Sequence, residues 1–458
     1  MFVRRLVPAL AVAIAAAAHP VAAQQAAPTE QKNAPAREIG TTSAEARAEF
    51  VSAIADVYNI FPERAVQHFD RALQLDPHYA LARAIRANTA PGLTPDEQSA
   101  QLDQAVAEAA AGPNQEVLNV LAWRARDVQE RRILLQGLVA LAPKTATYAY
   151  RLALTEPETP QRIAALQRVA QDFPDFAPVH NVLAYMIWDT GNHDAALREV
   201  QQYVQMLPDH PNPHDSYAEL LQRSGRYPEA LEHYGHAIAK APDFAEAYAG
   251  RAEVYQLTGK PAQARAEWQQ AIAHEVPAAQ GQHYGTLAGS YLLEGNRKLA
   301  LAAIGDAVKA GAFAQPGVPH ALMAMIEGSG GNVAAARGHL AEVGAHPPRT
   351  ELWAGLAALY SGDIDAARAA AGRAAKAGDP AAHVLNSILA SGAGDIATAQ
   401  QELQSASGAN GDALARAFLA EALARAGRKA DAQSLRDQVR AADVSILDDF
   451  ALLRVRKL

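Results

Sequence analysis

The sequence predicts an all-α solenoid built from about twelve stacked helix-turn-helix units. A 34-residue period is visible in three glycines, Gly191, Gly225 and Gly259. An alanine lies five residues after each of them, at Ala196, Ala230 and Ala264. Between these markers the apolar residues recur at steps of three and four, which is the spacing of amphipathic helices. A period that persists over consecutive units indicates repeats that share one continuous core.

The first 23 residues are typical of a secretory signal peptide. Arg4 and Arg5 precede an apolar run over 6–18, and a helix-breaking proline and small residues follow it. The run is shorter than the ~20 residues that cross a bilayer as a helix. We therefore expect residues 1–23 to be cleaved and no stable membrane span to remain. The mature chain is expected to be exported, to the periplasm of a bacterium or as a secreted protein.

The composition argues against several classes of function. The formal net charge is -8, whereas binding to nucleic acid needs a basic surface, so no nucleic-acid partner is expected. The sequence contains no cysteine, which excludes disulfides, thiolate metal sites and a cysteine nucleophile. The glycine-rich stretch 328–332 lacks the lysine of a phosphate-binding loop. No cofactor is expected.

The pattern of the sequence changes several times along the chain. Residues 24–42 are rich in polar residues and proline, which favours a flexible leader. Thr42 and Glu45 have the spacing of a capping box and predict the first helix of the folded part. The rest is predicted as divergent N-terminal helical repeats over 43–176, typical repeat units over 177–278 and looser C-terminal repeats over 279–458.

Each unit is expected to consist of two helices joined by a turn. Glycine ends the first helix in the left-handed conformation, and prolines such as Pro208 and Pro242 end the second. The recurrent alanines, among them Ala184, Ala218 and Ala252, lie where two helices approach closely. A single pair cannot bury its apolar face, so the units are expected to stack.

At these positions the chain resembles the tetratricopeptide repeat, a helix-turn-helix unit of 34 residues. The resemblance covers most of 43–446 and is strongest over 177–278. It implies a right-handed superhelix whose first helices line a concave groove that binds a peptide or a partner helix. The groove residues that it implies are Asn181, Tyr185, Trp188, Asp215, Glu219, Gln222, Arg223, Glu253 and Gln256.

The predicted groove residues allow other interpretations, and they favour one kind of partner. Tyr185 and Trp188 equally suit packing between units, and the polar positions equally suit a solvated face. Asp215, Ala249 and Gly285 stand where cytosolic chaperone adaptors of this family use lysine or asparagine. The resemblance therefore does not imply a partner with a C-terminal carboxylate. An extended segment with basic and aromatic residues suits the groove better.

The stretch PDHPNPHDSYAELL, residues 208–221, combines histidine, aspartate and serine but is typical of a helix start. Asn212 suits the N-cap, Pro213 the first helical position, and Asp215 the positive end of the helix dipole. Adjacent helical residues point about 100° apart, so His214, Asp215 and Ser216 cannot form a catalytic triad. No catalytic role is predicted here.

His233 and His236 lie three residues apart on a predicted second helix and share a face, as metal ligands can. No third ligand is evident near them in the sequence. The prediction is a solvated face and no metal site.

These observations together predict a non-catalytic protein–protein interaction scaffold or adaptor in the bacterial cell envelope. One alternative is an envelope chaperone, which would bind many apolar peptides weakly. A less favoured alternative is an enzyme that acts on a glycan, with its site in segment 97–176. A buried pair of arginine and glutamate there would support it, and outward-facing charges would count against it. The candidate residues are Trp123, Arg124, Arg126, Glu130 and Arg131.

Overall fold

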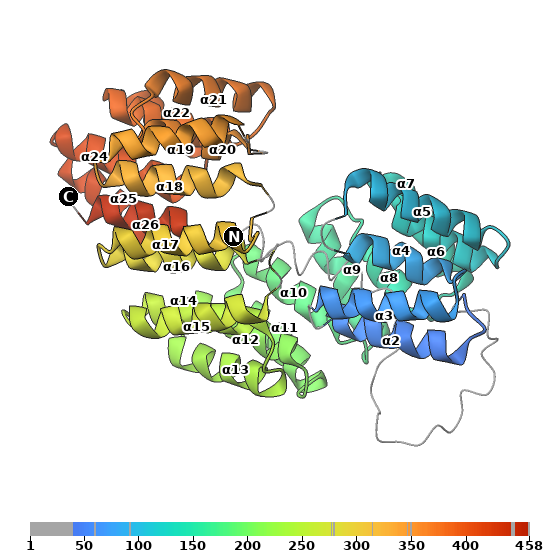
Figure 1. Ribbon diagram of the computed structural model, residues 1–458. Helices are drawn as coiled ribbons and strands as arrows, with labels where there is room; N and C mark the ends of the chain where they lie inside the picture. Colours follow the sequence, from blue (N-terminus) through green and yellow to red (C-terminus); the bar gives the residue numbers. More distant parts are fainter. Residues whose placement is uncertain are drawn as a thin grey trace. The chain divides into compact units, whose positions relative to one another are not determined.

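The computed structural model describes most of the chain beyond the predicted leader. The described residues are 40–58, 61–90, 93–275, 277, 280–313, 315–345, 347–348, 350–440 and 445–456. The predicted signal peptide over 1–23 and nearly all of the leader over 24–42 lie outside them. The described residues form 25 α-helices and no strand (Figure 1).

The chain forms two compact units, one ending at Phe244 and the other spanning Ala245–Leu458. The helices of the N-terminal unit are α2 (Ala44–Tyr58), α3 (Pro62–Leu75), α4 (Ala80–Thr89), α5 (Pro95–Ala109), α6 (Asn114–Arg124), α7 (Val128–Leu141), α8 (Ala146–Ala153), α9 (Thr159–Asp172), α10 (Pro178–Asp189), α11 (His193–Met206), α12 (Pro211–Arg223) and α13 (Tyr227–Lys240). The boundary between the units falls inside the segment 177–278.

The helices of the C-terminal unit are α14 (Ala245–Leu257), α15 (Pro261–His274), α16 (Gly281–Leu293), α17 (Arg297–Lys309), α18 (Gly317–Ser329), α19 (Val333–Ala345), α20 (Glu351–Tyr360), α21 (Ile364–Lys376), α22 (Ala381–Ala393), α23 (Ile396–Ser405), α24 (Asp412–Arg425), α25 (Lys429–Arg440) and α26 (Ile446–Val455). From α2 to α25 the described helices make twelve antiparallel pairs, and α26 follows as a single helix. The all-α repeat solenoid and its number of units are therefore confirmed.

The turns within the pairs use the predicted glycines. Gly191 and Gly225 have φ angles of 86° and 74°, in the left-handed region that side chains with a Cβ rarely adopt. The second helices α11 and α13 end just before Pro208 and Pro242. Proline cannot continue a helix, because it lacks the backbone N–H and its ring clashes with the preceding turn.

The repeated positions fill the core as the spacing predicts. The small residues that recur on the two helices of a pair are fully buried: Ala184, Ala196, Ala218, Ala230, Ala252 and Ala264. A second position in the same register holds larger buried residues, Val200, Tyr234 and Trp268. The alanines allow the helices to approach, and the larger side chains fill the space next to them.

Two predicted helix starts are wrong by one or two residues. The cap of α2 is Ser43 rather than Thr42, since the Ser43 hydroxyl accepts a hydrogen bond of 3.1 Å from the Ala46 amide. Asn212 is not the cap of α12, which begins at Pro211 after His210. Asn212 is instead buried and donates to the Tyr203 hydroxyl at 3.2 Å. Prolines at 211 and 213 both suit a first helical turn, so the sequence left the start ambiguous.

Helix α5 begins with a capping box. The Thr94 hydroxyl accepts from the Glu97 amide at 3.2 Å, and the Glu97 carboxylate accepts from the Thr94 amide at 2.8 Å. Replacing Thr94 with alanine should lower the free energy of unfolding by about 1 kcal/mol. Thr94→Ser keeps the hydroxyl and should stay close to wild type. Urea denaturation of the three chains tests this, and equal stability of Thr94→Ala and wild type would contradict it.

In the part of the chain that the structure describes, no helix has both the length and the apolar character that crossing a bilayer requires.

Candidate protein-binding site

Three of the predicted groove residues form one network across α10 and α12. The Tyr185 hydroxyl donates a hydrogen bond of 2.7 Å to Glu219 Oε2, and Arg223 pairs with Glu219 Oε1. The Arg223 guanidinium lies 5.8 Å from the centre of the Tyr185 ring. Burial, with the nearby Glu219 carboxylate, raises the pKa of Tyr185 well above its usual value, so the hydroxyl stays protonated. We call this side of α10 and α12 the first-helix face of the N-terminal unit.

The other predicted residues on α10 and α12 lie beside this network. Asn181 is buried, and its Oδ1 has no hydrogen-bond partner among the described residues. Trp188 is half-buried and stacks on His193, with ring centres 4.0 Å apart. Gln222 accepts a hydrogen bond of 2.9 Å from Tyr234 on α13. Asp215 is half-buried, and its charge contributes to the raised pKa of Tyr185.

The two remaining predicted residues belong to the C-terminal unit. Glu253 and Gln256 lie half-buried on α14. Gln256 Oε1 accepts a hydrogen bond of 3.2 Å from Ser290 on α16, and Arg265 donates to the same hydroxyl at 3.2 Å. One predicted residue, Gln256, is therefore linked to the neighbouring first helix by a side-chain hydrogen bond in this unit as well.

The structure also shows a column of histidines that the sequence analysis missed. Four histidines of first helices each contact a residue 19 positions later on the second helix of the same pair. The contacts are His180–Glu199 at 2.7 Å, His214–His233 at 3.2 Å, His320–His339 at 3.5 Å and His383–Glu402 at 2.7 Å. The spacing of 34 between His180 and His214 is the signal that could have revealed it.

His214 supplies a third histidine beside the HYGH stretch. The ring centres of His214, His233 and His236 lie 5.3 to 5.7 Å apart. The predicted solvated face holds for His236 but is wrong for His233, which is half-buried. No group of three or more histidine, aspartate or glutamate side chains in the described ranges is arranged to hold a metal ion.

The histidine cluster should make the stability of the N-terminal unit depend on pH. Burial, with His214 and His236 nearby, lowers the pKa of His233 from 6.5 to about 4, although Glu232 and Glu229 oppose the shift. As the pH falls from 6.5 to about 4, His233 of the unfolded chain gains a proton that the folded chain does not bind. The folded state therefore loses stability over this pH range.

The variant His233→Gln removes this titration. Between pH ~7 and ~4.5 its free energy of unfolding should therefore fall less than that of wild type, by on the order of 1 kcal/mol, since solvent screens this half-buried site. Denaturant unfolding at several pH values gives the difference. Parallel pH profiles for the two chains would show that His233 carries no such linkage.

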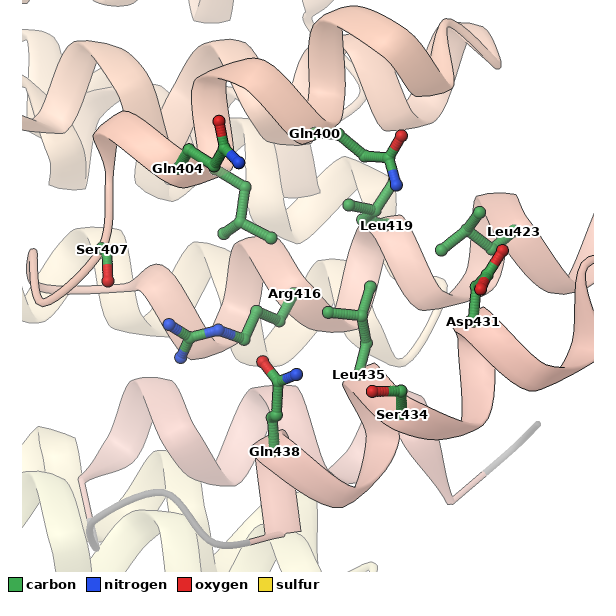
Figure 2. Close-up of a pocket in the computed structure, with 11 residues that line it drawn as sticks. Gln400, Gln404, Ser407, Arg416, Leu419, Leu423, Asp431, Ser434, Leu435 and Gln438 are labelled. Carbon is green, nitrogen blue, oxygen red and sulfur yellow. The ribbon is translucent and has the colours of Figure 1, made fainter.

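The described part of the C-terminal unit contains several cavities, two of which have walls from three or more helices. The first, of about 550 Å³, lies among the first helices α18, α20, α22 and α24, the second helix α21, and α26. Its lining residues are Gly328, Ser329, Leu359, Tyr360, Ile364, Arg368, Ile388, Leu389, Gly392, Ala393, Phe418 and Arg454. The second, of about 500 Å³, has mixed polar and apolar walls from α23, α24 and α25 (Figure 2). Neither was predicted from the sequence, because their walls come from units with looser spacing.

The residues of the enzymatic alternative do not form an acid–base site. Arg124, Arg126 and Glu130 are exposed. The buried arginine of this region is Arg151, whose guanidinium lies 4.2 Å from the Trp123 ring centre. Arg151 donates to Asn119 Oδ1 at 2.7 Å, and burial lowers its pKa to about 9. The five candidates thus contain no buried pair of arginine and glutamate, and their outward charges count against a glycan site.

Comparison with known proteins identifies repeats in both units. A TPR repeat model matches residues 220–259, and a tetratricopeptide repeat model matches residues 413–438. A comparison with curated protein sequences gives no match.

Several solved structures are similar to parts of this chain. PilW, a type IV pilus biogenesis factor, has 19% sequence identity and a TM-score of 0.38 over 45% of this chain and 95% of its own. A tetratricopeptide repeat protein from Parabacteroides merdae has 16% identity and a TM-score of 0.35 over 61% of this chain and 98% of its own. MamA has 18% identity and a TM-score of 0.31 over 35% of this chain and 92% of its own.

The first family match covers the end of α12, all of α13 and all of α14, and the second covers α24 and most of α25. Their turn glycines, Gly225 and Gly427, both lie in the left-handed region. With its stacked pairs and its 34-residue register, the chain is a tetratricopeptide repeat protein.

Proposed function

We propose that this protein is a non-catalytic scaffold or adaptor that binds a peptide or a partner helix on the first-helix face of the N-terminal unit. The observation that carries the proposal is the network of Tyr185, Glu219 and Arg223, which joins two consecutive first helices. Tetratricopeptide repeats generally serve as interaction scaffolds rather than catalysts. The signal-like N-terminus supports a site of action in the cell envelope after export.

The charges on this face favour a partner with basic and aromatic residues. Asp215 and Glu219 contribute two carboxylates, and Arg223 offsets one of them. The aromatic ring of Tyr185 lies beside these charges. A basic residue of a partner would be attracted to these carboxylates, and its apolar part would pack on the ring.

The test is affinity capture from an extract of the producing cells with matched variants. The groove variant carries Tyr185→Phe, Asp215→Asn and Glu219→Gln, which remove the hydroxyl and both charges but keep the volumes. The control carries Tyr227→Phe, Asp194→Asn and Glu232→Gln on second helices, where both acids are exposed. Thermal unfolding of the three chains confirms that each is folded.

We expect wild type and the control to retain the same protein and the groove variant to retain at least tenfold less of it, about 1.4 kcal/mol of binding energy. Equal retention by all three chains would contradict the proposed site. Retention of many unrelated unfolded proteins by all three would instead favour the chaperone alternative.

A further inference from the structure

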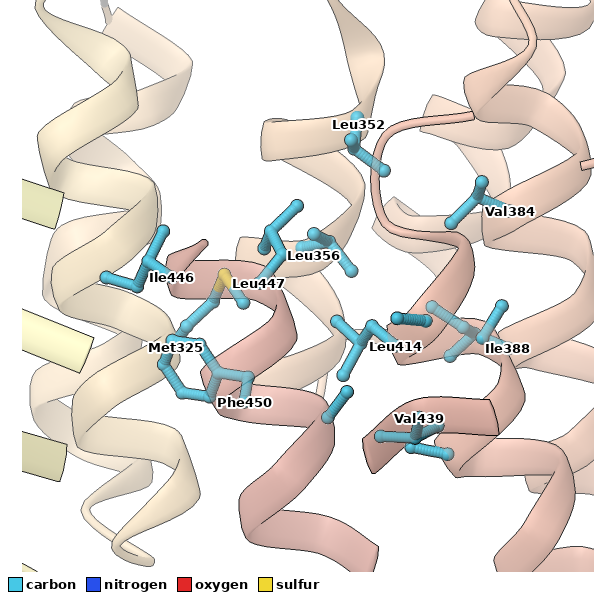
Figure 3. Packing of buried hydrophobic residues seen from close by; sticks show 14 of the residues in the cluster. Met325, Leu352, Leu356, Val384, Ile388, Leu414, Val439, Ile446, Leu447 and Phe450 are labelled. Carbon is cyan, nitrogen blue, oxygen red and sulfur yellow. The ribbon is translucent and has the colours of Figure 1, made fainter. Parts of the chain in front are cut away.

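Helix α26 packs against first helices of the C-terminal unit. The Phe450 ring of α26 lies 5.5 Å from the ring of Tyr360 on α20. Arg454 pairs with Glu421 on α24 at 2.8 Å, and its guanidinium lies 3.5 Å from the centre of the Phe418 ring. Figure 3 shows Ile446, Leu447 and Phe450 entering the cluster that contains Met325 and Leu356.

The surface under α26 corresponds in register to the predicted groove. Glu219 lies six residues before its turn glycine, Gly225. Gly289 and Glu421 lie six residues before the turn glycines of their own units, at 295 and 427. We call the side of α16, α20 and α24 that carries Gly289, Tyr360 and Glu421 the first-helix face of the C-terminal unit. On this face α26 takes the place that the family gives to a partner.

The face is shaped to admit a helix at close range. A Cβ atom on Gly289 would lie 1.8 Å from Asp449 Oδ2 and 3.1 Å from Asp449 Cβ, so glycine is required for this approach. One turn earlier, a Cβ atom on Gly285 would lie 3.7 Å from Ile446, which is ordinary contact. The two glycines therefore form a flat strip on α16 against which α26 lies.

α26 is nevertheless an imperfect occupant of this strip. Asp449 is 1% exposed, and its Oδ2 has no hydrogen-bond partner among the described residues. Burial, with the neighbouring Asp448, raises the pKa of Asp449 well above its ordinary value. A buried carboxyl without a partner weakens the packing of the helix that carries it. A helix with a neutral residue at this point would bind more tightly.

The same face continues beyond α26. The cavity of about 550 Å³ is lined by Tyr360 and Phe418, which contact α26, and by Leu359, Ile388 and Leu389, which extend the apolar wall. A partner longer than the ten residues of α26 would reach this additional surface.

We propose that the first-helix face of the C-terminal unit binds an amphipathic partner helix, which takes the place of α26. The partner carries aliphatic or aromatic residues where α26 has Ile446 and Phe450, a neutral residue in place of Asp449, and a cation that meets Glu421 in place of Arg454. The inference rests on the proposed function, because it assigns a second protein-binding face to the same scaffold.

The test uses full-length chains and a fluorescent peptide as the probe. The peptide comprises residues 445–456 with Asp449→Asn, and its binding is followed by fluorescence anisotropy. Four chains are compared: wild type, Phe450→Ala, Arg454→Ala and Asp449→Asn. These substitutions change α26 and leave the face beneath it intact. Arg454→Ala loses the contacts to Glu421 and Phe418 but leaves the apolar side chains of α26 in place, so it provides a milder release if Phe450→Ala does not fold.

We expect the peptide to bind Phe450→Ala or Arg454→Ala at least tenfold more tightly than wild type, and Asp449→Asn more weakly than wild type. Equal affinity for all chains, or no binding to any, would overturn the inference. Dimers of the released variants in size-exclusion chromatography would overturn it in favour of exchange of α26 between copies. Capture by the N-terminal face is measured separately, so failure here leaves the proposed function standing.

Discussion

Replacing Phe450 with alanine is expected to lower the free energy of unfolding of the C-terminal unit by about 3–5 kcal/mol. The side chain is 1% exposed and packs within the largest apolar cluster of this unit, beside Tyr360. Its removal leaves a cavity that rigid first helices cannot close. Because α26 is a single helix outside the twelve pairs, part of the loss should appear as release of this helix alone.

Two measurements detect this loss of stability. Urea denaturation gives the change in free energy, and limited proteolysis shows whether the C-terminal residues are cleaved first. Leu299→Ala, on the exposed side of α17 where the side chain is 42% exposed, is the control and should change stability by no more than about 0.5 kcal/mol. If Phe450→Ala were as stable as the control, the packing of α26 described above would be wrong.

Alanine at Gly289 and at Gly285 should have opposite effects, although the two residues lie one turn apart on α16. At Gly285 the added methyl group makes ordinary contact with Ile446, and alanine favours the helix by roughly 0.5–1 kcal/mol. At Gly289 the methyl group overlaps the buried Asp449 side chain, and overpacking of this kind costs about 1–3 kcal/mol.

A third substitution tests whether overlap with Asp449 causes the loss of stability in Gly289→Ala. Asp449→Ala removes the atoms that the methyl group would meet, so the double variant Gly289→Ala with Asp449→Ala should recover most of the stability. Thermal unfolding of the single and double variants gives the coupling energy of this pair. Additive effects, or equal effects of alanine at 285 and 289, would mean that the two helices do not touch at Gly289.

The repeat architecture could be predicted because each unit places equivalent residues in equivalent surroundings. Ala196 and Ala230 are buried for the same reason, so their spacing carries structural information. The position of a turn is fixed by one residue type, glycine, as at Gly191. Helix starts are harder to predict, because neighbouring residues can each suit the first turn of a helix. Helix α12 begins at Pro211, so Asn212 lies inside the helix and is not its N-cap.

The candidate site could be predicted only in part. The register placed Tyr185, Glu219 and Arg223 on one side of their helices, and the structure joins them. The register could not show that Glu219 and Arg223 pair with each other, because side-chain conformation decides that contact. The packing of α26 was missed because Asp449 lies 160 residues after Gly289 and outside the period. No local pattern predicts such a contact.

Site-specific photo-crosslinking tests the central claim, that partners bind to the first helices, most directly. A photoreactive phenylalanine analogue is introduced at Tyr185 or Gln222 on first helices, and at Tyr227 or Glu232 on the second helix α13. After irradiation in an extract of the producing cells, we expect the same protein to be crosslinked from positions 185 and 222 and not from 227 or 232. Crosslinks only from α13, or equally from all four positions, would contradict the claim.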